Sequence, residues 1–163
     1  MVEFRAMSKH LRIPDGDIDL LRELQRHDFP FVIIGGHAVR FHGVERGVDD
    51  VDVVVDADGR TDELATLILE VSGVSVIDNA QLGKPYKQVR LKNLRLYSEI
   101  LTSITGVDFA EAYQAAHVVE VQGVTVRVIS KEHLIRNKRA AGKEPGREKD
   151  LEDVERLEAL ATP

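Results

Sequence analysis

The chain has 163 residues, of which 43% are hydrophobic and 31% charged, and this size and balance are typical of one folded domain. Its 28 acidic residues exceed its 22 Lys and Arg residues and give a net charge of −6, which argues against a general attraction to nucleic acid or anionic membranes. The chain has no cysteine, so disulfides, thiolate zinc sites and cysteine nucleophiles are excluded.

Residues 1–14 have weak periodicity and mixed charge, and we expect them to form a partly ordered lead-in. They contain no apolar signal-peptide core, and no apolar run of about 18 residues suggests a membrane span. We therefore expect a cytoplasmic protein with no membrane partner.

Apolar periodicity and turn residues predict helices and strands that intermingle along the chain. The expected elements are, in chain order, a helix over 18–26 capped by Asp17, a strand over 31–34, a short helix over 38–41, a strand over 50–55, a helix over 61–71 closed by Gly73, a strand over 74–77, a hairpin of strands 86–91 and 94–101, a helix over 108–117, a hairpin of strands 118–121 and 124–129, a helix capped by Ser130 that runs to Ala141, and a last helix with Leu151, Val154 and Leu157 as its apolar stripe.

This order predicts the α+β (mixed α/β) class, with a central mixed sheet flanked by helices and followed by a C-terminal helical segment. We expect a single domain over residues 1–163, in which residues 15–129 form the sheet with its helices and residues 130–161 form the C-terminal helices.

Two aspartates stand at the mouth of an apolar strand in the segment FVIIGGHAVRFHGVERGVDDVDVVVD, residues 31–56. Because side chains alternate along a strand, Asp50 and Asp52 project from the same face, about 6.5–7 Å apart along the strand axis. Such a pair can hold a divalent cation, and the Gly35-Gly36 turn upstream is typical of sites that handle nucleotide phosphates. The alternative is a solvated strand end in a locally acidic stretch.

Metal sites that hold two ions commonly take a third carboxylate from a neighbouring strand, and two residues compete for that place. Asp108 lies three residues before Glu111, a spacing that favours a capping pair at a helix N-terminus. Glu99 lies in the predicted strand LRLYSEIL, where it can sit beside the strand of Asp50 and Asp52. We therefore predict that Glu99 completes the site.

Together these segments resemble the nucleotidyltransferase (DNA polymerase β-like) superfamily. GGHAVRFHGVERGVDDVDVVVD is similar to its small bacterial branch, which has the pattern GG-x-A-x-x-x-HG-x-x-R-x-T-x-D-hydrophobic-D and includes abortive-infection-type toxins and minimal nucleotidyltransferases. EILTSITGVDF resembles the strand of the third carboxylate, and VRVISKEHLIRNKRAAGKEPGREKDLEDVERL resembles the C-terminal block. The resemblance covers most of residues 30–160 and implies the nucleotidyltransferase fold.

The resemblance also implies roles for individual residues. Asp50, Asp52 and Glu99 would be the catalytic metal ligands for Mg²⁺ or Mn²⁺, and Glu99 could also deprotonate the acceptor. The residues expected to meet the phosphates of an NTP are Gly35, Gly36, Arg46 and Lys138. Lys149 is a further candidate cation, and Asp150 with Asp153 would hydrogen-bond nearby Lys and Arg side chains or cap the last helix.

The resemblance implies transfer of an NMP from an NTP to an acceptor hydroxyl on RNA, a protein or a small molecule, and a toxin with an antitoxin partner is one role in that branch. Three positions depart from the pattern: Val48 replaces a threonine, Glu45 replaces a proline, and Glu99 stands where Asp is common. An inactive nucleotide-binding or interaction module of the same fold is therefore one alternative. An antibiotic-type nucleotidyltransferase, which would share the same core site, is another.

Overall fold

A computed structural model describes residues 11–48, 50–93 and 95–160 of the chain. The predictions that concern residues 1–10, Leu94 and residue 161 lie outside this part. Leu11 and Ile13 are buried in the hydrophobic core, so the end of the predicted lead-in belongs to the folded structure.

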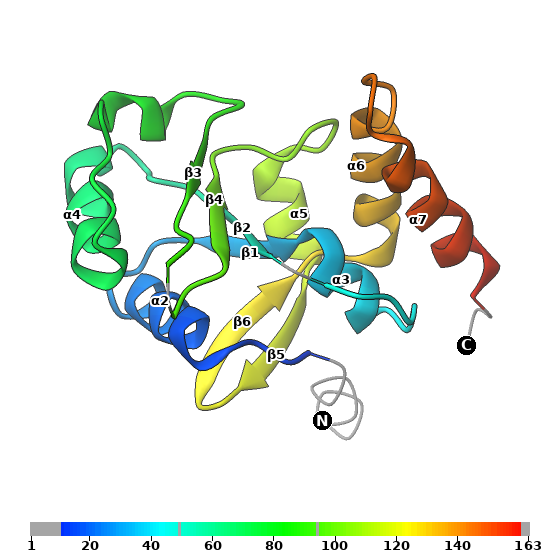
Figure 1. The fold of residues 1–163 in the computed structure, drawn as a ribbon, viewed down its shortest axis with the longest axis horizontal. Coiled ribbons are helices and arrows are strands. Elements are labelled where there is room, and N and C mark those ends of the chain that lie inside the picture. Colours follow the sequence, from blue (N-terminus) through cyan, green and yellow to red (C-terminus); the bar gives the residue numbers. More distant parts are fainter. Residues whose placement is uncertain (1–10, 49, 94, 161–163) are drawn as a thin grey trace.

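Helices and strands intermingle along the described residues, which confirms the predicted α+β class (Figure 1). The elements are, in chain order, α2 (Asp15–Arg26), β1 (Phe31–Ile34), α3 (Gly35–Phe41), β2 (Val51–Val55), α4 (Thr61–Ser72), the 3₁₀ helix η1 (Asn79–Gly83), β3 (Gln88–Arg90), β4 (Ser98–Leu101), α5 (Phe109–Ala115), β5 (His117–Val121), β6 (Val124–Val128), α6 (Lys131–Ala141) and α7 (Glu148–Ala159).

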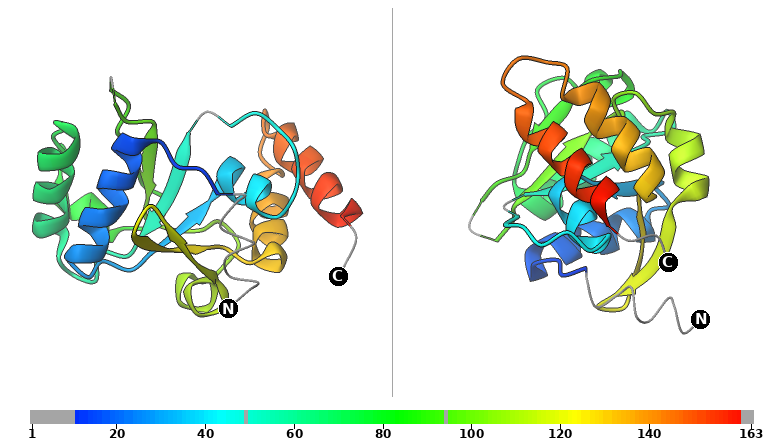
Figure 2. Two further views of the ribbon diagram at one scale, coloured as in Figure 1. Left: turned by 90° about the horizontal axis from the view of Figure 1, so that it is seen from below. Right: turned by 90° about the vertical axis from the view of Figure 1, so that its right-hand side faces the viewer.

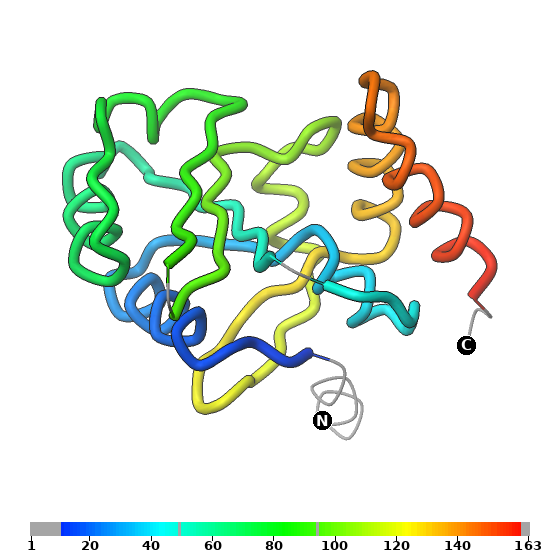
Figure 3. The backbone as a smooth tube through the Cα atoms, viewed as in Figure 1, coloured from blue at the N-terminus to red at the C-terminus, as the bar shows by residue number. Residues whose placement is uncertain are grey.

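The strands form a mixed sheet in the order β3-β4-β2-β1-β6-β5. Strand β1 pairs antiparallel with β2 and parallel with β6, and β2 pairs parallel with β4. The tube in Figure 3 shows β6 returning to lie beside β1, although the two strands are far apart in the sequence. Each of the two edges of the sheet is an antiparallel pair, β3 with β4 and β5 with β6. The apolar strands β1 and β2 are therefore central, which explains their almost uninterrupted burial.

Two pairs of helices lie at opposite ends of the molecule. In Figure 1 and in the left panel of Figure 2, α2 and α4 lie on the left and α6 and α7 lie on the right. Helix α2 contacts α4 and β6, while α6 packs against α7 and also contacts α3. Among the described residues, no helix has the length and hydropathy needed to cross a membrane.

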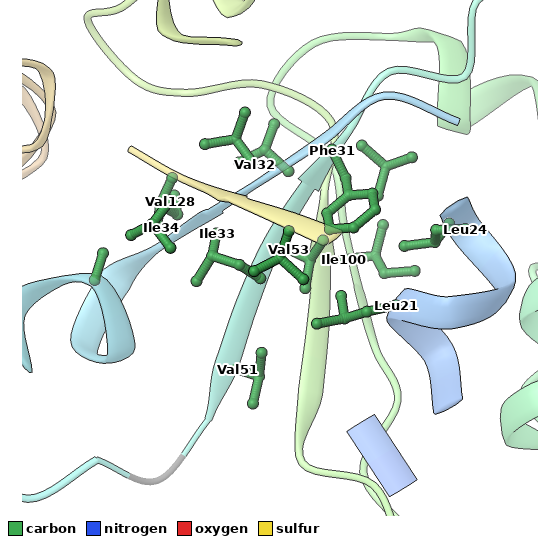
Figure 4. Close-up of a cluster of buried hydrophobic side chains, with 14 of the residues drawn as sticks. Leu21, Leu24, Phe31, Val32, Ile33, Ile34, Val51, Val53, Ile100 and Val128 are labelled. Atoms are coloured by element: carbon green, nitrogen blue, oxygen red, sulfur yellow. The ribbon is translucent and has the colours of Figure 1, made fainter. Parts of the chain in front are cut away.

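The core consists of aliphatic side chains from both the helices and the central strands. Figure 4 shows part of this core, where Leu21 and Leu24 of α2 join side chains of β1, β2, β4 and β6. Ile18, Leu21 and Leu24 are buried, as their helical spacing predicts.

Three predicted helix boundaries are confirmed by their caps. The Ser130 side chain accepts a hydrogen bond from the amide of His133 at the start of α6. The Asp108 side chain accepts one from the amide of Glu111, so this aspartate caps α5. Gly73 ends α4 in the left-handed conformation, with φ of 74°.

One predicted strand is absent and one predicted hairpin has shorter strands. Residues 74–77 form no strand, and the side chain of Ile77 is fully exposed. The hairpin predicted over residues 86–101 is present as the antiparallel pair of β3 and β4, and backbone hydrogen bonds from the amides of Leu91 and Asn93 to the carbonyls of Ser98 and Leu96 continue it toward the turn.

The apolar stripe predicted for the last helix is partly wrong. Leu151 is 42% exposed, whereas Val154 and Leu157 are buried as predicted. The inward face of α7 instead includes two carboxylates, Asp150 and Asp153, and both bind cations from elsewhere in the chain.

Candidate active site

A cavity of about 310 Å³ lies where β1 gives way to α3. Side chains of β2 and β4 line it together with the segment that enters β3, and α6 with the start of α7 lines it from the other side. The predicted site residues that line it are Gly35, Asp52, Glu99, Lys138 and Asp150. Residues far apart in the sequence therefore meet at one opening.

Asp52 and Glu99 face the cavity from neighbouring strands. They are in register in the parallel pair of β2 and β4, and Asp52 is also in register with Ile34 of β1. Burial raises the pKa of Asp52 to about 7, and the charges of Glu99 and Asp50 add to this effect. The charges of Lys138 and Arg147 lower the pKa of Asp52 but do not offset the increase. A carboxylate that is this costly to ionise favours a bound cation.

Gly35 permits the close approach of α3 to the carboxylate of Asp52. Its φ of +69° lies in the left-handed region, and a Cβ at this position would overlap the Asp52 carboxylate. Gly36 follows in the first turn of α3, beside the Val48 side chain and the guanidinium of Arg46. The glycine pair therefore leaves backbone, without side chains, beside the acid.

Asp50 lies immediately before β2 and does not line the cavity. Its charge still raises the pKa of Asp52, so the two carboxylates influence each other electrostatically. Within residues 11–48, 50–93 and 95–160, no group of three or more His, Asp or Glu side chains is arranged to hold a metal ion. The three predicted ligands therefore do not form a closed protein cage.

The donor set fits a hard divalent cation nonetheless. Mg²⁺ is usually bound through one or two carboxylates together with substrate phosphates, and it keeps several waters, so a cage made only of protein is not required. Asp52 and Glu99 supply that carboxylate pair, and the raised pKa of Asp52 reflects its burial together with the nearby charges of Glu99 and Asp50. Asp50 could join them from the start of β2.

The predicted phosphate-binding cations form a buried ionic network with α7. The Lys138 Nζ atom lies 2.8 Å from Asp150 Oδ1 and 3.0 Å from Asp153 Oδ2. Arg46 Nη1 lies 2.6 Å from Asp153 Oδ2, and Arg147 Nε lies 2.8 Å from Asp150 Oδ2. Three cations face two carboxylates, so the network retains one net positive charge.

The network also lowers the pKa of Asp150. Burial tends to raise the pKa of Asp150, but its hydrogen bond and charge interaction with Lys138, followed by those with Arg147, lower it overall. The expectation that Asp150 and Asp153 bond nearby cations is thus met by their contacts with Lys138, Arg147 and Arg46. Lys138 donates a hydrogen bond to Asp150 and forms an ion pair with Asp153, and its ammonium group also lines the cavity.

Lys149 and Arg147 differ in their relation to the cavity. Lys149 is exposed and does not line the cavity, whereas Arg147 does line it. The sequence signal for Arg147 is its position three residues before Asp150, which brings the two side chains together at the start of α7.

The prediction that Asp17 caps the first helix is wrong, because Asp17 lies within the first turn of α2. It is fully buried, its Oδ1 atom accepts a hydrogen bond from the Tyr97 amide at 2.9 Å, and it also accepts one from the Ser98 hydroxyl. Burial raises the pKa of Asp17. Because Glu99 directly follows Ser98, Asp17 anchors the segment that presents Glu99. No spacing along the chain predicts this contact between distant residues.

Comparison with known proteins identifies the family. The model of a family described as nucleotidyl transferase of unknown function (DUF2204) matches residues 17–161. The chain belongs to this nucleotidyl transferase family. No curated protein sequence matched the chain.

Solved structures share the nucleotidyltransferase fold with this family member. An antigenic nucleotidyltransferase-like protein from Paracoccidioides brasiliensis is 22% identical with a TM-score of 0.55, and the match covers 91% of this chain and 77% of that one. The solution structure of the antibiotic-resistance factor ANT(2'')-Ia is 21% identical with a TM-score of 0.57, over 87% and 80% of the two chains. ANT(2'')-Ia in complex with adenylyl-2''-tobramycin is 22% identical with a TM-score of 0.54, over 86% and 84%. At these identities the likeness concerns the fold.

Proposed function

We propose that this nucleotidyl transferase moves an NMP from an NTP to an acceptor hydroxyl with the help of Mg²⁺ or Mn²⁺. The observation that carries the proposal is the in-register pair Asp52 and Glu99, which lies at a cavity shared with Gly35 and the buried Lys138. This combination puts acids for a cation and donors for a triphosphate at one place.

In the proposed site Asp52 and Glu99, joined by Asp50, hold the divalent cation. The bound cation would supply Lewis-acid polarisation of the α-phosphate and screening of its charge. The ammonium group of Lys138 donates to a phosphate oxygen, and the backbone at Gly35 and Gly36 approaches the triphosphate closely.

Glu99 is the proposed base for the reaction. It accepts the proton of the acceptor hydroxyl, and the acceptor oxygen forms a bond to the α-phosphorus. The bond from this phosphorus to the oxygen that bridges to the β-phosphate breaks, so pyrophosphate leaves with that oxygen and its electron pair. Arg46 is held by Asp153 beside Gly36, so its proposed contribution is to the positive potential at the start of α3.

A catalytically inactive nucleotide-binding module is the second candidate. Val48 favours it, because its methyl groups pack against Gly36 where a threonine hydroxyl is usual in the pattern. Glu45 gives little support to the inactive module, because its side chain is exposed and its charge is screened by solvent and salt.

Transfer of label from α-³²P NTPs tests the proposal. The full chain with Mg²⁺ would be offered total RNA, its own side chains and an aminoglycoside as acceptors. We expect labelled product from the wild type and a loss of at least about 100-fold in Asp52→Asn, as removal of one strong electrostatic contact typically gives. Asp56→Asn is the matched control, because Asp56 is exposed just after β2. NTP binding without any transfer would favour the inactive module.

A further inference from the structure

Site residues from three neighbouring strands lie in a defined order across the sheet. Ile34 at the end of β1, Asp52 in β2 and Glu99 in β4 are in register, and neighbouring strands lie about 4.8 Å apart. The glycine pair of α3 therefore lies on the β1 side of Asp52, and Glu99 lies on the other side. Beyond Glu99 the cavity continues toward β3, where Tyr86 lines it.

Tyr86 has two features that packing does not explain. Its side chain is 75% exposed although it lines the cavity, and its φ of +60° is a left-handed value that non-glycine residues seldom adopt. Strained residues of this kind persist where the surrounding structure holds them, and they gather at functional sites.

Hydrogen bonds hold Tyr86 in this conformation. Its amide donates to the Ser103 hydroxyl at 2.8 Å, and the next amide, of Lys87, donates to the Thr102 hydroxyl at 3.0 Å. The Thr102 amide in turn donates to the Lys87 carbonyl at 3.0 Å. These hydrogen bonds fix the backbone of the segment that enters β3, which is green in Figure 1.

In-line transfer requires different ligands on the two sides of the site. This step rests on the proposed function. The attacking hydroxyl and the leaving pyrophosphate must stand on opposite sides of the α-phosphorus. The glycine pair and Lys138 serve the triphosphate. Glu99, the proposed base, lies on the β4 side of Asp52, and the segment that enters β3 with Tyr86 lines the cavity beyond β4. The acceptor therefore enters from the Tyr86 side.

The residues on this side indicate what kind of acceptor fits. Apart from Glu99, the wall formed by β3, β4 and the adjoining segments carries one aromatic ring, one cation, one aliphatic side chain and uncharged polar groups: Tyr86, Lys87, Leu101, Gln88, Ser103 and Thr105. The other lining acids are Asp52 in β2, Glu144 between α6 and α7, and Asp150 in α7. We propose that Tyr86 and Lys87 bind the acceptor, and that the acceptor is a hydroxyl-bearing ring compound that is anionic, such as a nucleoside phosphate, rather than a polycation.

The chain has no tryptophan, so Tyr86→Trp would create a single fluorescent reporter that keeps an aromatic ring at this place. With the nucleotide side filled by Mg²⁺ and α,β-methylene ATP, uridine 5′-monophosphate should change the emission of this reporter, and tobramycin should not. A six-nucleotide RNA in the same titration distinguishes a strand end from a free nucleotide as the source of the ring. Tyr97→Trp, at a tyrosine that is 42% exposed and does not line the cavity, should remain silent.

Calorimetry gives the second measurement. Tyr86→Ala should weaken binding of the monophosphate to the filled protein about tenfold, since stacking on one aromatic ring has an effect of this order. Tyr86→Ala should leave the affinity for α,β-methylene ATP unchanged. Tyr86→Gly should have the same effects on both affinities, and its melting temperature should be no lower than that of the wild type, because glycine relieves the backbone strain.

Three results would overturn the inference. The first is that Tyr86→Ala binds α,β-methylene ATP tenfold more weakly than the wild type does. The others are that the wild type binds tobramycin more tightly than the monophosphate or RNA, or that Tyr86→Ala binds the monophosphate with unchanged affinity. Failure of the wild type to bind the analogue at all would instead refute the proposed function.

Discussion

At the scale of single residues, the site depends on one glycine whose role is geometric. Gly35 combines a left-handed backbone with contact to the Asp52 carboxylate, so a side chain would meet both a conformational and a steric penalty. The other positive-φ glycines provide a way to separate these two effects.

We expect Gly35→Ala to lower stability and to abolish NTP binding, because the new Cβ must displace either Asp52 or the start of α3. Gly123→Ala is the matched control, since Gly123 has a φ of +81° and open space around its Cβ position. The control should lower the free energy of unfolding by only about 1 kcal/mol, the penalty for a left-handed backbone at a non-glycine residue, and it should leave NTP binding intact. Urea unfolding and calorimetric titration measure the two quantities, and equal losses in both variants would contradict the steric role.

At the scale of elements, α7 is attached to α6 by charge as well as by apolar packing. Asp150 and Asp153 are buried with Lys138, and the network extends to Arg46 in the connection between α3 and β2. Buried ion pairs add little net stability when intact, but removal of one partner is costly. The C-terminal helices are thus held in place by groups that also line or adjoin the cavity.

Asp153→Ala should therefore destabilise the protein by about 3–5 kcal/mol, because Arg46 loses its carboxylate and Lys138 keeps only Asp150. Glu158→Ala removes a second bridge between the same two helices, Arg139 to Glu158, whose side chains are about half exposed. That control should cost less than about 1 kcal/mol. Denaturant unfolding measures both, and a similar small loss in the two variants would show that the buried network is not needed for stability.

Local signals predict the elements well and their long-range partners poorly. The caps at Ser130 and Asp108 depend on residues three positions apart, so the sequence alone locates both helix starts. Glu99 was predicted to lie beside the aspartate strand, and β4 does pair with β2 in that register. Asp17 was misassigned as a cap, because its partners Tyr97 and Ser98 are eighty or more positions away.

The same limit explains the misread segments. Residues 74–77 have strand-like composition, but pairing depends on where the tertiary fold places a segment relative to the sheet, which composition does not encode. Leu151 follows an apolar spacing in α7, yet the inward positions belong to Asp150 and Asp153, because cations from α6 and the segment before β2 meet them there. Tyr86 gives no sequence signal, since its importance lies in exposure and backbone conformation.

At the scale of the whole molecule, two kinds of buried group make stability depend on pH in opposite ways. Burial lowers the pKa of both His37 and His42 from 6.5 to about 4. As pH falls from 6.5 toward 4, the unfolded chain binds protons that the folded chain does not, so stability decreases. His37→Gln should reduce this acid-side loss of melting temperature, and thermal melts that show the same loss as the wild type would contradict the prediction.

The pKa shift of Asp52 makes stability depend on pH in the opposite direction. Its pKa rises from 3.8 in the unfolded chain to about 7 in the folded protein, so its contribution to stability is complete below pH 3.8 and is lost as pH rises through 7. In EDTA, Asp52→Asn should match the wild type near pH 4 and become more stable than the wild type above pH 7, by up to about 4 kcal/mol. Asp56→Asn, at an exposed position, should follow the wild type throughout. Thermal melts across this range decide the question, because a difference that shrinks with rising pH cannot come from a buried carboxylate that resists ionisation.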